Sequence, residues 1–132
     1  MIPQRADCLV LFGATGDLAY KKLFPALHEL QARGQLGIPV VGIAREGWTL
    51  ERLQDRIRDS LRDAGLDPDD DAAKDLIGSM RYVHGEYSDP ATFDDLASVL
   101  SDVSLPVFYL AIPPDLFGEV VDALAHHDLT QN

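Results

Sequence analysis

The sequence has little cysteine, no long apolar run and no repeat. Its 132 residues include one cysteine, Cys8, so the chain cannot form an internal disulfide. A single thiol is typical of proteins in a reducing compartment, and we expect a cytoplasmic location. No apolar run reaches the ~18–20 residues that a membrane span needs, and residues 1–7 lack the apolar core of a signal peptide. These absences argue against disulfide-rich secreted proteins and against membrane proteins.

Basic residues are also scarce. Lys and Arg total 11 against 22 Asp and Glu, which gives a formal net charge of −11. A field of that sign repels the phosphate backbone of nucleic acids and an anionic membrane surface, so we expect neither as a partner. A small anionic ligand is still compatible with this charge, because a few local donors can outweigh a distant average charge.

The rest of the composition is that of one small globular domain. Hydrophobic residues make up 46% of the chain and charged residues 25%, close to the average for globular domains. No Gly/Ser-rich linker interrupts the sequence. We therefore expect residues 1–132 to form a single domain.

Short apolar runs alternate with helical patterns along the chain. The runs predict buried strands over residues 8–12, 40–44, 80–85 and 105–111. Apolar spacing predicts helices from about residue 17 to 34, over 50–64, over 72–79, from 90 to 100 and around 117–124. Pro25 is expected to kink or split the first helix, and the acidic turn at 67–71 can cap the third. The alternation predicts an α/β, Rossmann-like fold, in which a parallel sheet of about four strands carries helices on both faces.

A glycine pair lies where the first strand becomes the first helix. Gly13 permits a tight turn, Gly16 lets a pyrophosphate approach the backbone, and Ala19 lets the helix pack closely on the strand. The free N–H groups and the positive dipole end of the helix then face the anion. Asp17 is interpreted first as a carboxylate that stabilises the helix start and second as a ligand contact. The spacing and its context predict a dinucleotide-binding loop.

The exit of the second strand bears on which dinucleotide is bound. Arg45 lies where NAD-binding domains carry an acid for the ribose 2′-hydroxyl, and its charge favours the 2′-phosphate of NADP. Glu46 follows directly, and NAD becomes acceptable if Glu46 points inward and Arg45 outward. Ligands bind at the carboxyl ends of parallel strands. Glu86 and Tyr87, after the third strand, and residues 112–114, after the fourth, are therefore expected beside the same crevice.

These motifs resemble those of a known family. The segment 13–27, Gly-Ala-Thr-Gly-Asp-Leu-Ala-Tyr-Lys-Lys-Leu-Phe-Pro-Ala-Leu, closely resembles the coenzyme loop and first helix of glucose-6-phosphate dehydrogenases. Segments 41–45, 85–87 and 108–114 are similar to the next three strand regions of that family, in the same order. The resemblance implies the strand order 3-2-1-4. The cofactor-binding residues that it implies are Gly13, Ala14, Thr15, Gly16, Asp17, Leu18, Ala19, Tyr20, Arg45, Glu86, Tyr87, Ala111, Ile112, Pro113 and Pro114.

The resemblance also implies a reaction. Members of this family oxidise glucose 6-phosphate to 6-phosphogluconolactone, in the pentose phosphate pathway of glucose metabolism, with hydride transfer to NADP. The resemblance implies that Lys22 takes the position of the family's lysine near the sugar phosphate. It also implies that Arg45 takes the position of the arginine that contacts the 2′-phosphate of NADP. Tyr20 stands where many members carry a basic residue. The full-length form is expected to be a homo-oligomer.

The family's substrate signature, Arg-Ile-Asp-His-Tyr-Leu-Gly-Lys-Glu, is absent from this sequence. We therefore expect the chain to stop before the catalytic domain, to hold no catalytic residue, and to bind NADP weakly without turnover when alone. The four histidines have no obvious orienting carboxylate and are expected in structural or surface roles. His126 and His127 are adjacent and make a poor metal pair, so no metal site is expected.

Two other functions remain open. One is a free-standing NADP-binding module or redox sensor without catalysis. The other is a reductase with a similar glycine loop, but that class needs a Tyr-x-x-x-Lys pair, which this sequence lacks. The strand order that the resemblance implies leaves the fourth strand at an edge of the sheet that the next strand normally covers, so the chain is expected to self-associate or to be only marginally stable.

Overall fold

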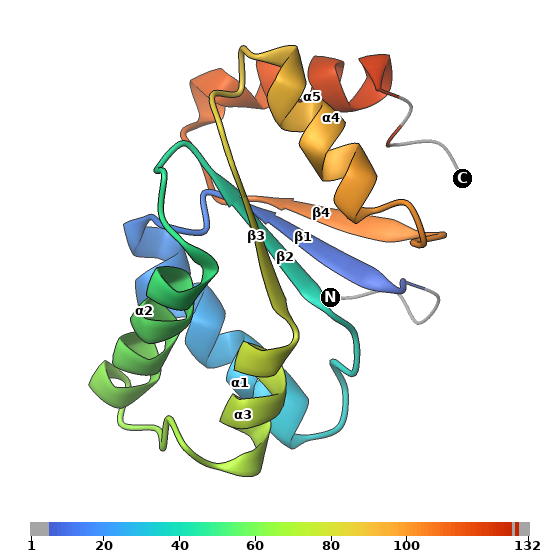
Figure 1. The fold of residues 1–132 in the computed structure, drawn as a ribbon. Helices are drawn as coiled ribbons and strands as arrows, with labels where there is room; N and C mark the ends of the chain where they lie inside the picture. Colours follow the sequence, from blue (N-terminus) through green and yellow to red (C-terminus); the bar gives the residue numbers. More distant parts are fainter. Residues whose placement is uncertain (1–5, 128, 130–132) are drawn as a thin grey trace.

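The computed structural model describes residues 6–127 and 129. At its centre is a four-stranded parallel sheet in the order β3-β2-β1-β4 (Figure 1). The strands are β1 (Cys8–Phe12), β2 (Val40–Ala44), β3 (Met80–His84) and β4 (Pro106–Leu110). The predicted fold class and strand order are confirmed.

Helices cover both faces of the sheet, on opposite sides in Figure 1. One group is η1 (Ala19–Leu23), a π-helical turn, with α1 (Phe24–Ala32), α2 (Leu50–Asp63) and α3 (Asp71–Gly78). The other is α4 (Pro90–Val99), the short 3-10 turn η2 (Pro114–Leu116) and α5 (Phe117–His126). Within the described residues, no helix combines the length and the hydropathy that crossing a membrane would take.

The central strand β1 divides the core into two layers. Leu9 and Leu11 pack with α1, α2 and α3, whereas Val10 and Phe12 pack with α4 and α5, because successive side chains of a strand point to opposite faces. All five residues of β1 are buried. A strand that is covered on both faces is apolar throughout, which explains the continuous apolar run in the sequence.

The first helix changes its winding near Pro25. Helical structure begins at Asp17, and in the π-helical turn that follows, the N–H of Phe24 donates to the carbonyl of Ala19, five residues back. Pro25 lies in the first turn of α1, but the helix is continuous from Asp17, so the missing N–H removes one helical hydrogen bond. The helix is not interrupted at Pro25; where a kink or split was expected, the structure shows a change from π-helical to α-helical winding.

The junction between α1 and α3 depends on one carboxylate. Asp70 accepts a hydrogen bond from the backbone N–H of Ala73 at 2.8 Å and so caps α3 as predicted. It also lies 3.0 Å from Nε2 of the buried His28 on α1. The expectation that no histidine has an orienting carboxylate is therefore wrong for His28, and also for His127, whose Nε2 lies 3.2 Å from Asp94. Both are tertiary contacts, which spacing along the chain does not show.

Candidate coenzyme-binding site

The glycine loop begins directly after β1 and is packed against the exit of β4. Gly13 has a φ of 81°, and its N–H donates to the carbonyl of Ile43 at 2.8 Å. A Cβ atom at this position would overlap the carbonyl oxygen of Ala111. Gly13 is therefore needed both for its conformation and for the close approach of two chain segments.

The second glycine of the loop has a different environment. The N–H of Gly16 donates to the carbonyl of Gly13 at 3.0 Å, and the helix starts at the next residue. A Cβ atom on Gly16 would meet only that carbonyl oxygen, at 3.4 Å. The protein itself therefore leaves space at Gly16. A helix start that faces open space presents its leading N–H groups and its positive dipole end to an anion.

A cleft of about 150 Å³ opens beside this loop, at the carboxyl ends of the strands. It collects many of the residues that the sequence placed at a coenzyme site. These are Gly13, Thr15, Gly16, Arg45, Tyr87, Ala111, Ile112 and Pro113. Ala44, Glu46 and Leu116 also line it. Leu116 is not among the predicted site residues, because its side chain reaches the cleft only through the turn η2.

The other predicted coenzyme residues do not line this cleft. Ala14 and Ala19 are fully buried and pack the loop onto the sheet, and Leu18 is exposed. Asp17 is exposed, with a carboxylate oxygen 4.0 Å from Arg56 on α2. Glu86 is exposed and its carbonyl accepts a hydrogen bond from Thr92, and Pro114 is the exposed first residue of η2.

Tyr20 faces α2 instead of the cleft. Its hydroxyl donates to the carboxylate of Asp63, and its carbonyl accepts from the Ser60 hydroxyl at 2.5 Å. The guanidinium carbon of Arg56 lies 4.5 Å from the centre of the Tyr20 ring and 5.7 Å from that of Trp48. These contacts hold the start of the first helix against α2.

Two opposite charges lie side by side at the exit of β2. Arg45 is exposed and borders the cleft, and it forms no ion pair with any carboxylate in the described part of the chain. The Glu46 carboxylate accepts a hydrogen bond from the hydroxyl of Thr15 at 2.7 Å, across the cleft mouth. The Glu46 carbonyl accepts a hydrogen bond from the Tyr82 hydroxyl on β3. Glu46 thus points toward the glycine loop, while Arg45 is free to bind an anion.

Tyr87 forms the wall of the cleft after β3. Its side chain is buried, with a ring 5.7 Å from that of Phe12. Burial raises the pKa of its phenol to about 12, although the Gly13 amide and the Arg45 charge lower it. The phenol is therefore neutral at pH 7 and is available as a hydrogen-bonding group, not as a base.

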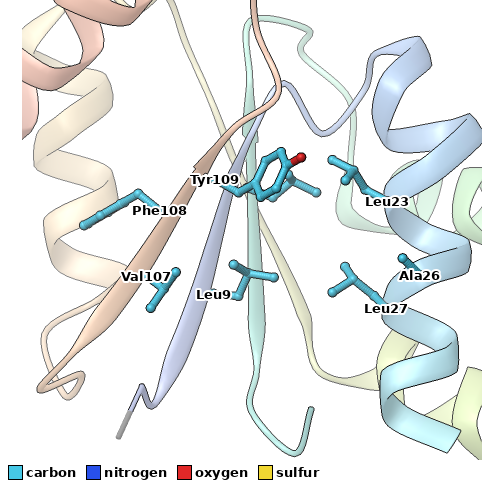
Figure 2. A pocket seen from close by; sticks show the side chains of 8 residues that line it. Leu9, Leu23, Ala26, Leu27, Val107, Phe108 and Tyr109 are labelled. Atoms are coloured by element: carbon cyan, nitrogen blue, oxygen red, sulfur yellow. The ribbon is translucent and has the colours of Figure 1, made fainter. Parts of the chain in front are cut away.

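Lys22 does not border the coenzyme cleft. It is exposed on η1 and lines a separate concavity with Lys21, His28 and Ala64, among others. A further hollow of about 210 Å³ lies between α1 and the edge of the sheet. Figure 2 shows its apolar lining, with Leu23, Ala26 and Leu27 on one side and Leu9, Val107 and Tyr109 on the other. That hollow contains no charged group and no residue of the coenzyme cleft.

The ionisable side chains that line the cleft are Arg45, Glu46 and Tyr87. No histidine or lysine is among the residues that line it. The thiol of Cys8 is buried in β1, and burial raises its pKa to about 11, so it is an inert core residue. In the described residues no group of three His, Cys, Asp or Glu side chains could hold a metal ion.

Comparison with known proteins gives a consistent result. The family model described as "Glucose-6-phosphate dehydrogenase, NAD binding domain" matches residues 10–132. The glucose-6-phosphate 1-dehydrogenase 1 of Mycobacterium tuberculosis is 37% identical over 122 residues, which cover 92% of this chain and 26% of that protein. The glucose-6-phosphate 1-dehydrogenase of Bacillus subtilis is 31% identical over 136 residues, which cover 96% of this chain and 27% of that protein. This chain thus spans about a quarter of the length of these curated relatives.

Solved structures show the same similarity. A crystal structure of glucose-6-phosphate 1-dehydrogenase from Mycobacterium avium matches with a TM-score of 0.90 and 39% identity, over 96% of this chain and 28% of that one. A glucose-6-phosphate dehydrogenase in complex with its substrate glucose-6-phosphate matches with a TM-score of 0.86 and 27% identity, over 98% of this chain and 30% of that one.

Proposed function

The chain belongs to the glucose-6-phosphate dehydrogenase family, and we propose that it binds NADP within an enzyme that oxidises glucose 6-phosphate to 6-phosphogluconolactone. The observation that carries this proposal is the cleft itself. A glycine loop at a helix start, Arg45 and the buried Tyr87 border one space at the carboxyl ends of the strands, where nucleotides bind in folds of this class. The relatives are dehydrogenases, which disfavours a stand-alone module without catalysis.

Each part of the cleft has a role in this proposal. The diphosphate lies against the backbone of Gly16, where the leading N–H groups of the helix donate to it. Arg45 binds the 2′-phosphate with a charge that no described carboxylate neutralises. Tyr87, Ile112 and Pro113 form walls that exclude water from the bound coenzyme. Once bound, NADP supplies the hydride acceptor.

The remaining chemistry needs groups that the cleft does not contain. We propose that Lys22 contacts the sugar phosphate, and that the catalytic base belongs to the part of the enzyme that this chain does not span. On its own the chain is then inactive and binds NADP weakly. We also propose that the intact enzyme is a cytoplasmic homo-oligomer; the single, buried thiol suits a reducing compartment.

A substitution at Gly16 tests the binding mode. Gly16→Ala adds a Cβ atom that the protein tolerates but that lies where the diphosphate approaches. We expect the NADP affinity to fall at least about tenfold, or about 1.4 kcal/mol, with little change in the unfolding temperature. Calorimetric titration and thermal unfolding measure the two quantities.

The matched control is Gly78→Ala, because Gly78 lies in α3 with open space at its Cβ position. It should leave the NADP affinity unchanged. If Gly16→Ala binds NADP as tightly as the unmodified chain does, the diphosphate does not lie at this loop and the proposed function loses its main support.

A further inference from the structure

Glu46 is held in the coenzyme cleft at two points. Its carboxylate accepts a hydrogen bond from the Thr15 hydroxyl at 2.7 Å, and its carbonyl accepts one from the Tyr82 hydroxyl. The residue borders the same cleft as Gly13 and Gly16. The Thr15 hydrogen bond therefore orients the exposed carboxylate toward the glycine loop, and the Tyr82 hydrogen bond holds the backbone at the exit of β2.

In dinucleotide-binding folds, the residues at the exit of the second strand recognise the adenosine ribose. The adenosine ribose lies at the exit of the second strand, where a carboxylate accepts a hydrogen bond from a 2′-hydroxyl and an arginine accommodates a 2′-phosphate. Here both groups are present, in consecutive residues. Arg45 and Glu46 both border the cleft, and the two do not form an ion pair with each other. Each charge is thus able to act on the 2′-substituent.

We infer that Glu46, oriented by Thr15, determines coenzyme specificity in this protein and makes its cleft accept NAD as well as NADP. The inference rests on the proposed function, since it concerns the same cleft. With NAD, the carboxylate accepts the 2′-hydroxyl and Arg45 remains beside it. With NADP, Arg45 attracts the 2′-phosphate, while Glu46 repels it at close range.

Thr15 explains why the carboxylate does not simply turn away. Glu46 is exposed, and without a hydrogen-bond partner its side chain could turn into solvent to avoid a phosphate at little cost. Here the movement breaks the hydrogen bond to Thr15, and the backbone stays fixed by Tyr82. NADP binding therefore has a penalty that NAD binding does not have.

The test compares both coenzymes on one pair of variants. Glu46→Gln removes the charge but keeps an oxygen that can accept the Thr15 hydrogen bond, so the loop geometry is retained. We expect the NADP affinity to rise about tenfold, the scale of one close repulsive charge pair near a protein surface, and the NAD affinity to fall or stay the same. Glu51→Gln, in the exposed first turn of α2, is the control for an equal change of net charge. It should change neither affinity.

Calorimetric titrations with NAD and NADP at one ionic strength separate the outcomes. If the unmodified chain binds neither coenzyme, the proposed function fails and this inference fails with it. If both coenzymes bind but Glu46→Gln leaves their affinity ratio unchanged, only the inference is overturned. A ratio that moves equally in Glu51→Gln would also overturn it, because the effect would then come from net charge alone.

Discussion

At the scale of single residues, the two glycines of the loop do different things. Gly13 has a left-handed backbone and no room for a side chain, because the Ala111 carbonyl lies against it. Gly16 has room within the protein. The sequence pattern treats both as parts of one loop, but in the structure Gly13 is required by the packing of the fold, whereas Gly16 is not.

A substitution at Gly13 should therefore destabilise the protein. In Gly13→Ala the left-handed conformation is strained, and the new Cβ atom forces the exit of β4 away. We expect the free energy of unfolding to fall by at least about 1–3 kcal/mol, measured by urea denaturation. Gly34→Ala is a matched control, since Gly34 has a φ of 70° but nothing within 4 Å of its Cβ position. A loss at Gly13 no larger than the loss at Gly34 would contradict the role of the Ala111 contact.

At the scale of elements, the sequence predicts the bounds of a strand where those bounds depend on the local apolar pattern. β1 and β2 have the predicted bounds, because each is buried on both faces and ends at a change of composition. The predicted third strand is one residue too long and the fourth extends too far at both ends. Gly85 and Ala111 each follow the last paired residue of their strand, although their N–H groups still donate to the carbonyls of Ala44 and Phe12.

Contacts between elements could not be predicted in the same way. The Thr15–Glu46 hydrogen bond spans 31 positions, and the Tyr20–Asp63 hydrogen bond spans 43. Each depends on how α2 or the exit of β2 is placed against the loop, which periodicity does not specify. The glycine motif predicts where the loop lies. It does not predict that Thr15 borders the cleft while Tyr20 packs on α2, because that depends on how the elements pack.

The junction of α1 and α3 makes a prediction about acid stability. The Ala73 amide, followed by His28, holds the pKa of Asp70 below its usual value of 3.8. A carboxyl group whose pKa is lower in the folded than in the unfolded protein stabilises the folded state when the pH is above the unfolded pKa. For Asp70 this stabilisation is lost as the pH falls below about 3.8 and passes through the lower pKa of the folded protein. Asp70→Asn should therefore lower the unfolding temperature at pH 7 and flatten its decline between about pH 4 and pH 2.

Thermal unfolding monitored by circular dichroism across that pH range measures the effect. Asp122→Asn, an exposed change of the same charge on α5, is the control. If the Asp70→Asn and Asp122→Asn proteins lose stability in parallel as the pH falls, the Asp70 carboxylate does not contribute to the acid dependence.

At the scale of the whole molecule, the two edges of the sheet differ in character. β3 mixes buried and exposed positions and carries Arg81 and His84 as exposed residues. β4 pairs only with β1 among the described strands, and Val107, Phe108, Tyr109 and Leu110 give it no charge. The apolar hollow of Figure 2 lies beside it on the face of α1. An unpaired, uncharged edge of this kind readily pairs with another strand.

Self-association of the chain through β4 is the prediction that follows. The net charge of −11 keeps copies apart at low salt, and salt screens that repulsion, so the average mass should rise with both concentration and ionic strength. Tyr109→Lys places a charge on the partly exposed edge residue and should keep the protein monomeric under the same conditions. Light scattering across a salt series measures the mass. Val121→Lys, the same change in net charge at an exposed position on α5, should still self-associate. An unmodified chain that stays monomeric at high concentration and high salt would contradict this prediction.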